Sequence, residues 1–231
     1  MSATLRRFTP LVVLAGMAAV AFAFDLHRYL TLDELRENSQ VLQAFVAEHS
    51  VLAAATYIAA YVAIVALSLP GGTVMTVAGG FLFGALVGGS LAVCAATLGA
   101  ALVFLIARTV VGEALRKRAG PFLQSLEAGF RANAFSYLLF LRLVPAFPFW
   151  VINLVPALAG VRLGIFAAAT VIGIMPATFI FAAFGAGLGE LFDAGGDIRL
   201  ADVLSPTLIA ALVGLGLLAL LPIALRKWRS P

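Results

Sequence analysis

Arg142 is the residue best suited to chemistry in this sequence, because it stands inside a long apolar stretch. Residues 138–164 read LLFLRLVPAFPFWVINLVPALAGVRLG, with hydrophobic side chains on both sides of the arginine. An arginine at the centre of a membrane costs at least about 2.5–3.5 kcal/mol, so we expect it to face a polar cavity or a partner. Its planar guanidinium suits phosphate or carboxylate. The alternative is an arginine near the cytoplasmic surface, satisfied by lipid headgroups or backbone carbonyls.

Two segments are expected to interrupt helices and to surround such a site. They are Pro70-Gly71-Gly72 and the stretch from Pro145 to Pro148. Proline removes a backbone donor and clashes with the preceding turn, glycine adds flexibility, and the N–H groups at a helix start favour anions. We therefore predict the breaks as tips of helical hairpins that bind a substrate together with Arg142. The alternative is that the prolines only bend packed helices. The candidate binding residues are Arg142, Asn153, Pro70, Gly71, Gly72, Pro145 and Pro148.

Other kinds of chemistry lack the residues they need. The sequence has no nucleophile–base pair, phosphate-binding P-loop or cluster at metal-ligand spacing, and none of its 11 acidic residues lies deep in an apolar run. His27 and His49 lie in a polar segment, and the single Cys94 cannot form an intramolecular disulfide. We predict no enzymatic activity, no cofactor, no metal and no nucleic-acid partner.

The apolar runs define the class of protein. Hydrophobic residues make up 63% of the chain and charged residues 11%, whereas a soluble domain has roughly a quarter of its residues charged. A helix needs on the order of 20 apolar residues to cross a bilayer, and several runs reach that length. The sequence therefore predicts an all-α, polytopic membrane protein without a separate soluble domain. The runs cover about 10–24, 51–69, 73–108, 132–161, 163–189 and 206–225.

The charges alternate along the chain, with a net charge of +4. Basic residues gather at both ends and around the central polar loop, while acidic residues dominate 25–50 and 190–205. The positive-inside rule then predicts cytoplasmic termini, in a bacterial-type inner membrane. The first 24 residues also have the form of a signal peptide, but we expect an uncleaved helix. The basic residues concerned are Arg6, Arg7, Arg108, Arg116, Lys117, Arg118, Arg131, Arg226, Lys227 and Arg229.

This orientation requires an odd number of crossings in each half of the core, 51–190. We predict a re-entrant hairpin at 51–88 entering from outside and a span at 90–108. After a cytoplasmic loop at 109–133, a hairpin at 134–161 enters from inside, and a span follows at 163–189. Opposed hairpins form an inverted repeat, and residues 79–84 are weakly echoed eighty positions later, at 159–164. Residues 1–50 hold the first helix and an external segment, and 191–231 hold an acidic external loop, the last helix and the basic tail.

Two smaller patterns predict local structure. Thr31 and Glu34 have the form of a capping box. They open an amphipathic segment that lies on the outer membrane face or extends the next span, with Leu32, Leu35, Leu42, Phe45 and Val46 on its apolar side. Gly80, Gly84 and Gly88 recur every four residues, which predicts a small-residue stripe on one helix face and allows a homo-oligomer through that face.

Two longer motifs resemble a known family. LPGGTVMTVAGGFLFGALVGG at 69–89 and FLRLVPAFPFWVINLVPALAGV at 140–161 resemble the two halves of the DedA superfamily, also called the VTT or SNARE-associated Golgi protein family. The resemblance covers roughly residues 60–190. It implies two opposed re-entrant hairpins and movement of lipids across bilayers. Members have been linked to phospholipid scrambling, return of the undecaprenyl phosphate carrier and proton-dependent membrane homeostasis.

The resemblance also carries over individual residues and shows one departure. The matching positions are Pro70, Gly71, Arg142, Pro145, Pro148 and Asn153. Bacterial members typically have an acidic residue just after the first Pro-Gly, where this chain has Gly72, and this weakens the case for proton coupling there. Secondary candidates are Arg108 and Glu113, after the first half, and Arg162, which is expected to reach the inner membrane surface.

The leading hypothesis is therefore a translocator of lipids or lipid phosphates, with membrane lipids as its partners. An alternative is a non-transporting protein that organises the membrane or assists assembly of other complexes. A third hypothesis, a transporter of small solutes or ions, would require more polar groups along the spans than the sequence contains.

Overall fold

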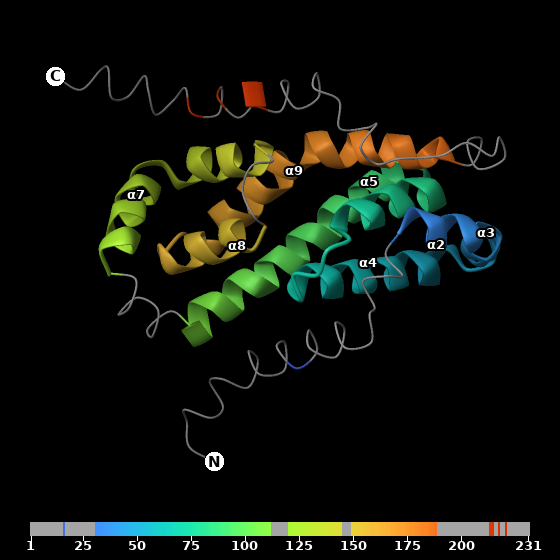
Figure 1. Ribbon diagram of the computed structural model, residues 1–231, viewed down its shortest axis with the longest axis horizontal. Coiled ribbons are helices and arrows are strands. Elements are labelled where there is room, and N and C mark those ends of the chain that lie inside the picture. The colour runs from blue at the N-terminus through green and yellow to red at the C-terminus, as the bar shows by residue number, and fades with distance from the viewer. Residues whose placement is uncertain are drawn as a thin grey trace, which may run out of the picture. The chain divides into compact units, whose positions relative to one another are not determined.

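The computed structural model describes residues 31–111, 120–144 and 149–188, together with single positions 16, 213, 214, 217 and 220. Every regular element within these ranges is a helix, which confirms the all-α prediction (Figure 1). The predicted first helix, the acidic loop at 190–205 and the last span lie outside the described residues, apart from those single positions. In order, the elements are α2 (Leu32–Glu37), α3 (Ser39–Glu48), α4 (Ser50–Ala66), α5 (Gly72–Ile106), η2 (Ala107–Val111), α7 (Gly120–Leu143), α8 (Phe149–Leu158) and α9 (Leu163–Ala186).

The described residues divide into two compact units. The first-half unit contains 31–99 and 175–188, and the second-half unit contains 100–111, 120–144 and 149–174. Helices α5 and α9 each contribute residues to both units. Each unit is described by itself below.

In the first-half unit, α4 and the start of α5 form an antiparallel hairpin (Figure 1). Tyr57 Oη donates to the Met75 carbonyl and Tyr61 Oη to the Gly72 carbonyl, both at 2.9 Å, so α5 runs back along α4. The chain reverses at 67–71, where Gly71 has a φ of 137° that glycine adopts at little cost. The break therefore falls at the predicted Pro-Gly-Gly segment.

Gly84 divides α5 into two segments. Its φ of 78° and ψ of 167° are not helical, and they separate 72–83 from 85–106. A Cβ on Gly88 would overlap the carbonyl of Gly79, so the two segments fold back on each other with their backbones in contact. Gly80 packs in the same way on the backbone of Ala182 in α9.

The predicted stripe of Gly80, Gly84 and Gly88 on one helix face is therefore wrong. Gly84 is a turn, and the other two glycines allow close approach of backbones within the chain. A homo-oligomer through these residues stays a prediction, and it would have to compete with those intrachain contacts.

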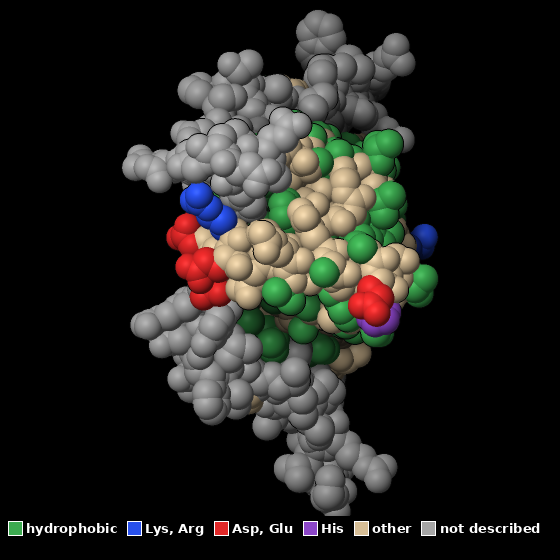
Figure 2. Space-filling model, turned by 90° about the vertical axis from the view of Figure 1, so that its right-hand side faces the viewer, with side chains coloured by type: hydrophobic (Ala, Val, Ile, Leu, Met, Phe, Trp, Pro, Cys, Tyr) green, Lys and Arg blue, Asp and Glu red, His purple; other side chains and the backbone are tan. Residues whose placement is uncertain are grey.

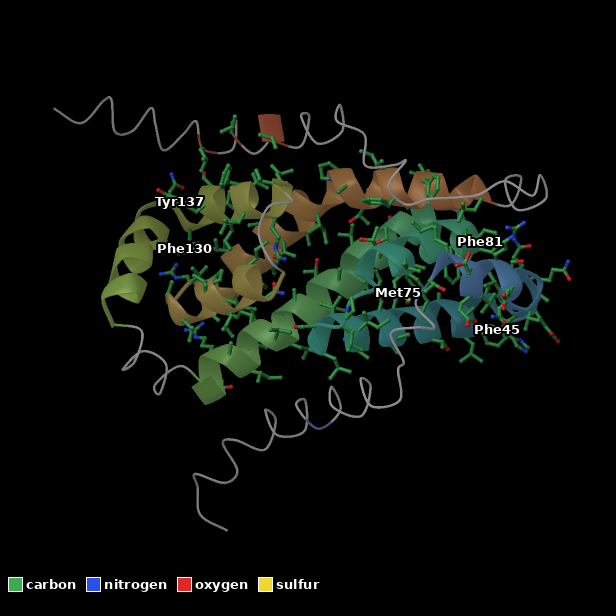
Figure 3. The ribbon with its side chains drawn as sticks, viewed as in Figure 1. Phe45, Met75, Phe81, Phe130 and Tyr137 are labelled. Atoms are coloured by element: carbon green, nitrogen blue, oxygen red, sulfur yellow. The ribbon has the colours of Figure 1, made fainter. Side chains whose placement is uncertain are left out.

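In the second-half unit, α7 is divided at Asn133, whose φ of −163° and ψ of 61° interrupt the helix. The interruption coincides with the predicted end of the loop and start of the second hairpin. The rings of Phe130 and Tyr137 lie on either side of it, with centroids 6.0 Å apart (Figure 3). After α8, Gly160 with a φ of 73° precedes α9.

The described elements of the two halves of the chain follow a similar order. Each half has a helix, then a short helix, a glycine of positive φ and a long helix. The two glycines, Gly84 and Gly160, are 76 positions apart (160 − 84), whereas the sequence echo has an offset of eighty. That echo pairs Gly84 with Gly164, the second residue of α9, and the inverted repeat stays a prediction. The orientation of each hairpin across the membrane stays a prediction.

The long helices have the length and surface of membrane spans. At about 1.5 Å per residue, 85–106 and α9 are roughly 33 and 36 Å long, enough to cross a hydrocarbon core of about 30 Å, whereas 72–83 reaches only roughly 18 Å. Large apolar side chains are exposed along both long helices, and Leu86 is 77% exposed. Such a surface is stable in lipid and costly in water. The other large apolar side chains exposed on these two helices are Val87, Leu98, Leu102, Leu105, Ile172, Met175 and Ile180.

The N-terminal end of the first-half unit begins with the predicted cap. Thr31 Oγ1 accepts a hydrogen bond from Glu34 N at 3.2 Å, while the Glu34 carboxylate accepts one from Asn38 Nδ2 at 3.3 Å. The helix is interrupted at Asn38 and again at His49, so this segment is not an extension of α4. Leu35 is buried against Val77, Phe181 and Leu188 of the same unit.

Replacing Tyr61 with phenylalanine is expected to lower the free energy of unfolding by about 1 kcal/mol, because the Gly72 carbonyl and Thr76 Oγ1 lose a buried hydrogen-bond partner. Tyr61 Oη bonds both the Gly72 carbonyl and Thr76 Oγ1, at 2.9 and 2.8 Å. Thermal unfolding in detergent measures the change. Tyr137→Phe, on a half-buried ring in α7, is the matched control. Equal melting temperatures for Tyr61→Phe and wild type would contradict the prediction.

Candidate functional site

Three helices of the second-half unit meet at Arg142. The arginine lies near the end of α7, and its Nη2 donates to Asn153 Oδ1 of α8 at 2.6 Å and to Thr170 Oγ1 of α9 at 3.0 Å. Asn153 is fully buried and Thr170 is 1% exposed. The helix packing thus places the guanidinium beside polar groups from both neighbouring helices.

Thr170 is oriented as an acceptor for the arginine. Its hydroxyl donates to the Phe166 carbonyl one turn earlier, at 2.7 Å, so its oxygen lone pairs are left to accept from Nη2. Arg142 Cζ also lies 5.3 Å from the centre of the Phe166 ring, within cation–π range. The ring of Phe104 packs on that of Phe166, with centroids 4.5 Å apart. The cation therefore has an aromatic wall as well as polar partners.

Gly173 allows α7 to approach α9 at this point. A Cβ on Gly173 would overlap Arg142 Cβ and lie 3.2 Å from its Cγ. Phe166, Thr170 and Gly173 are spaced by four and three residues, which puts them on one face of α9. This face accommodates the entire arginine side chain, from Cβ to guanidinium.

The side-chain amide of Asn153 also has an NH2 group, which needs a hydrogen-bond acceptor. Its Oδ1 faces the guanidinium, because arginine only donates hydrogen bonds. Its Nδ2 is buried, and no acceptor for it lies among the described residues. A buried donor without a partner costs about 1–3 kcal/mol. An anionic oxygen at this position would receive that hydrogen bond.

The structure brings together only some of the predicted site residues. Arg142 and Asn153 are in direct contact. Arg162 is exposed between α8 and α9, and Arg108 is exposed in η2, so neither belongs to this cluster. Pro145, Pro148 and Glu113 lie outside the described residues.

The first predicted break belongs to a separate polar cluster in the first-half unit. Thr76 Oγ1 donates to the Gly72 carbonyl at 3.0 Å and also bonds Tyr61 Oη. Pro70 is exposed at the turn and Gly71 is half-buried beside it. This cluster lies between α4 and the start of α5, and its members are uncharged.

Sequence reasoning missed Thr170, Phe166, Tyr61 and Thr76. A weak signal existed for the first pair, because a hydroxyl and an aromatic residue four positions apart share a helix face in the otherwise apolar α9. This signal is not specific by itself, because the arginine that contacts both residues comes from another helix, α7.

The part of the chain that the structure describes is helical, has two helices long and apolar enough to cross a bilayer, and buries polar clusters between helices. These are features of a membrane protein. Comparison with known proteins identifies the family. The VTT domain matches residues 69–187, more than half of the chain, so the protein belongs to the VTT family. This confirms the resemblance to the DedA superfamily.

The relatives are membrane proteins as well. The chain is 32% identical over 193 residues to the transmembrane protein 41 homolog of Dictyostelium discoideum, covering 82% of this chain and 56% of the relative. It is 28% identical over 200 residues to transmembrane protein 41B of Mus musculus, covering 85% of this chain and 66% of the relative. The chain thus spans just over half to two thirds of these relatives' lengths. No solved structure matches it.

Proposed function

We propose that this protein translocates or scrambles lipids or lipid phosphates across the cytoplasmic membrane, without enzymatic chemistry. The observation that carries the proposal is the Arg142 cluster, in which α7, α8 and α9 hold a guanidinium between Asn153 and Thr170. The family of membrane proteins to which the chain belongs supports it. A cation fixed among apolar helices would attract the phosphate of a headgroup while the acyl tails stay in the bilayer.

The hairpins supply the second part of the mechanism. Helices 72–83 and α8 are too short to cross a bilayer, which supports assigning them to re-entrant elements. Non-helical backbone at membrane depth is tolerated only where protein buries it or water reaches it. Opposed hairpins would therefore give headgroups a polar route through the membrane, and the shared order of elements supports an inverted repeat.

The test is reconstitution into liposomes that carry fluorescent phospholipid or labelled polyprenyl phosphate. We expect wild-type protein to accelerate the loss of lipid asymmetry over protein-free liposomes. Solute counterflow in the same liposomes separates lipid movement from small-solute transport. Lipid exchange no faster than in protein-free liposomes, from protein that is folded, would refute the proposal.

One observation favours the alternative of a non-transporting assembly or membrane-organising factor. The hydrogen bonds of Arg142 join three helices, so the arginine would also serve as a purely structural tie. If the protein is such a factor, variants of Arg142 should lose folding or partner binding. The wild-type protein would then show no lipid flux in the first place. The liposome assay discriminates the two functions.

Membrane orientation gives a separate prediction. With both termini cytoplasmic, a cysteine at Glu37 of α2, which is exposed, should react with an impermeant maleimide in whole cells. A cysteine at Ser230, in the basic tail, should react only after permeabilisation. The native Cys94 is exposed and is first changed to alanine. The reverse labelling pattern would show that the charge bias gave the wrong orientation.

A further inference from the structure

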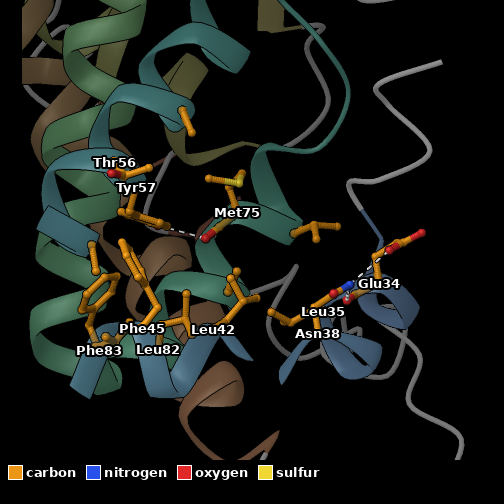
Figure 4. Close-up of a pocket in the computed structure, with 15 residues that line it drawn as sticks. Glu34, Leu35, Asn38, Leu42, Phe45, Thr56, Tyr57, Met75, Leu82 and Phe83 are labelled. Carbon is orange, nitrogen blue, oxygen red and sulfur yellow. Dashed lines mark hydrogen bonds between the residues drawn. The ribbon is translucent and has the colours of Figure 1, made fainter. Parts of the chain in front are cut away.

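A pocket in the first-half unit stands apart from the polar clusters. It has a volume of about 380 Å³ and lies between α3, α4 and the short segment 72–83 (Figure 4). The wall is mainly hydrocarbon and aromatic, and its larger side chains are Leu42, Phe45, Met75, Leu82 and Phe83. The Tyr57 hydroxyl, also on this wall, is occupied by the Met75 carbonyl. The interior therefore presents an apolar surface.

Besides Thr56 and Tyr57, two polar residues line the pocket, and both belong to the α2 end. They are Glu34 of α2 and Asn38, the C-cap of that helix, and the Glu34 carboxylate accepts a hydrogen bond from the Asn38 amide at 3.3 Å. Figure 2 shows two separate groups of acidic side chains, one beside basic side chains and one beside a histidine. The acidic residues described in this unit are Asp33, Glu34, Glu37 and Glu48, and Glu34 is the one that lines the pocket. Glu34 thus gives this edge of the pocket a carboxylate, and Arg36 is the basic residue on the same helix.

We propose that this pocket binds one acyl chain of a membrane lipid whose headgroup carries an ammonium group, such as phosphatidylethanolamine. The volume is near the lower end of the range of about 300–1,000 Å³ for small-molecule sites, which suits a single chain better than a whole two-chain lipid. The inference rests on the proposed lipid translocation and names the lipid class that would approach this half of the protein.

The charged edge decides the headgroup. A chain that moves from the bilayer into an apolar pocket gains little from the hydrophobic effect, because both surroundings are hydrocarbon. Selectivity must then come from the polar end. A carboxylate at 34, held by Asn38, attracts an ammonium group and repels an anionic headgroup such as phosphatidylglycerol.

The test is photolabelling of the full chain in nanodiscs with phosphatidylethanolamine that carries a diazirine in one acyl chain. Crosslinks located by mass spectrometry should concentrate on the pocket wall in α3, α4 and 72–83. Ala60→Trp, at an exposed position that lines the pocket, should reduce them about tenfold, which lies within the range expected for overfilling an apolar site. Ala59→Trp is the matched control, because Ala59 is exposed on α4 outside the pocket.

The headgroup is tested separately. The same acyl probe on phosphatidylglycerol should label the pocket less than the ethanolamine lipid. Glu34→Gln should remove that preference, whereas Glu37→Gln, on the same helix but outside the pocket, should preserve it. Equal labelling by both probes in wild type would overturn the assignment of headgroup.

Two results would overturn the pocket itself. One is labelling that Ala60→Trp and Ala59→Trp reduce equally. The other is capture of residues 1–30 of the same chain by a photoreactive amino acid at Ala60, which would assign the pocket to the protein's own N-terminal segment. Labelling requires no transport, and Arg142→Ala should still be labelled, so failure here is distinguishable from failure of the proposed translocation.

Discussion

Replacing Gly88 with alanine is expected to lower the free energy of unfolding by at least about 3 kcal/mol. The new Cβ would overlap the carbonyl of Gly79 and lie 2.8 Å from the backbone nitrogen of Gly80. Backbone atoms cannot turn aside as a flexible side chain can. The two segments of α5 would have to separate, and the hairpin closed at Gly84 would open.

Gly164 provides a control of opposite sign. It is the second residue of α9 and nothing lies within 4 Å of its Cβ position. Alanine there should be neutral or stabilising by up to about 1 kcal/mol, because alanine favours the helix. Thermal unfolding of both variants in detergent gives the comparison. Similar melting temperatures for Gly88→Ala and Gly164→Ala would show that the backbones are not in contact at Gly88.

The break between α4 and α5 was readable from the sequence, but the turn at Gly84 was not. Proline and glycine act on the backbone of their own segment, so Pro70 and Gly71 indicate a break without knowledge of the fold. A glycine every four residues fits a helix stripe as well as a turn. Whether the segment forms a continuous helix or a turn depends on the contact between Gly79 and Gly88. A contact between residues nine positions apart leaves no signal in the local sequence.

The Arg142 cluster also combines a residue that has a local sequence signal with a residue whose contact is nonlocal. A charge in an apolar run is costly wherever the helices pack, so Arg142 was identifiable from the sequence alone. Thr170 satisfies its own donor on the Phe166 carbonyl, as threonine does in many helices, and needs no other partner. Its contact with the arginine follows only from the approach of α7 to α9 at Gly173.

Charge alternation predicted opposed halves, and the inverted repeat stays a prediction. The similar order of described elements includes the positive φ of Gly84 and Gly160, and composition does not distinguish these two glycines from their neighbours. A backbone angle of this kind has no signal in residue type alone.

Replacing Arg142 with leucine is expected to abolish lipid translocation while the protein stays folded. An apolar residue of similar bulk fills the space and removes the desolvation cost of a buried charge. Asn153 Oδ1 loses its donor, which costs about 1–3 kcal/mol, whereas Thr170 keeps its bond to the Phe166 carbonyl. Flux in liposomes should fall at least about tenfold, as expected for loss of a hydrogen bond to a charged group.

Three further variants separate charge, geometry and structure. Arg142→Lys keeps the charge but loses the planar fork whose Nη2 serves both Asn153 and Thr170, so intermediate flux is expected. Arg142→Ala should lose flux and also stability, because it leaves a cavity beside Phe166. Arg162→Leu, at an exposed arginine, should preserve flux within about twofold. If Arg142→Leu scrambled lipid at the wild-type rate, the guanidinium would be a structural tie, since translocation that needs a fixed cation cannot survive its replacement by hydrocarbon.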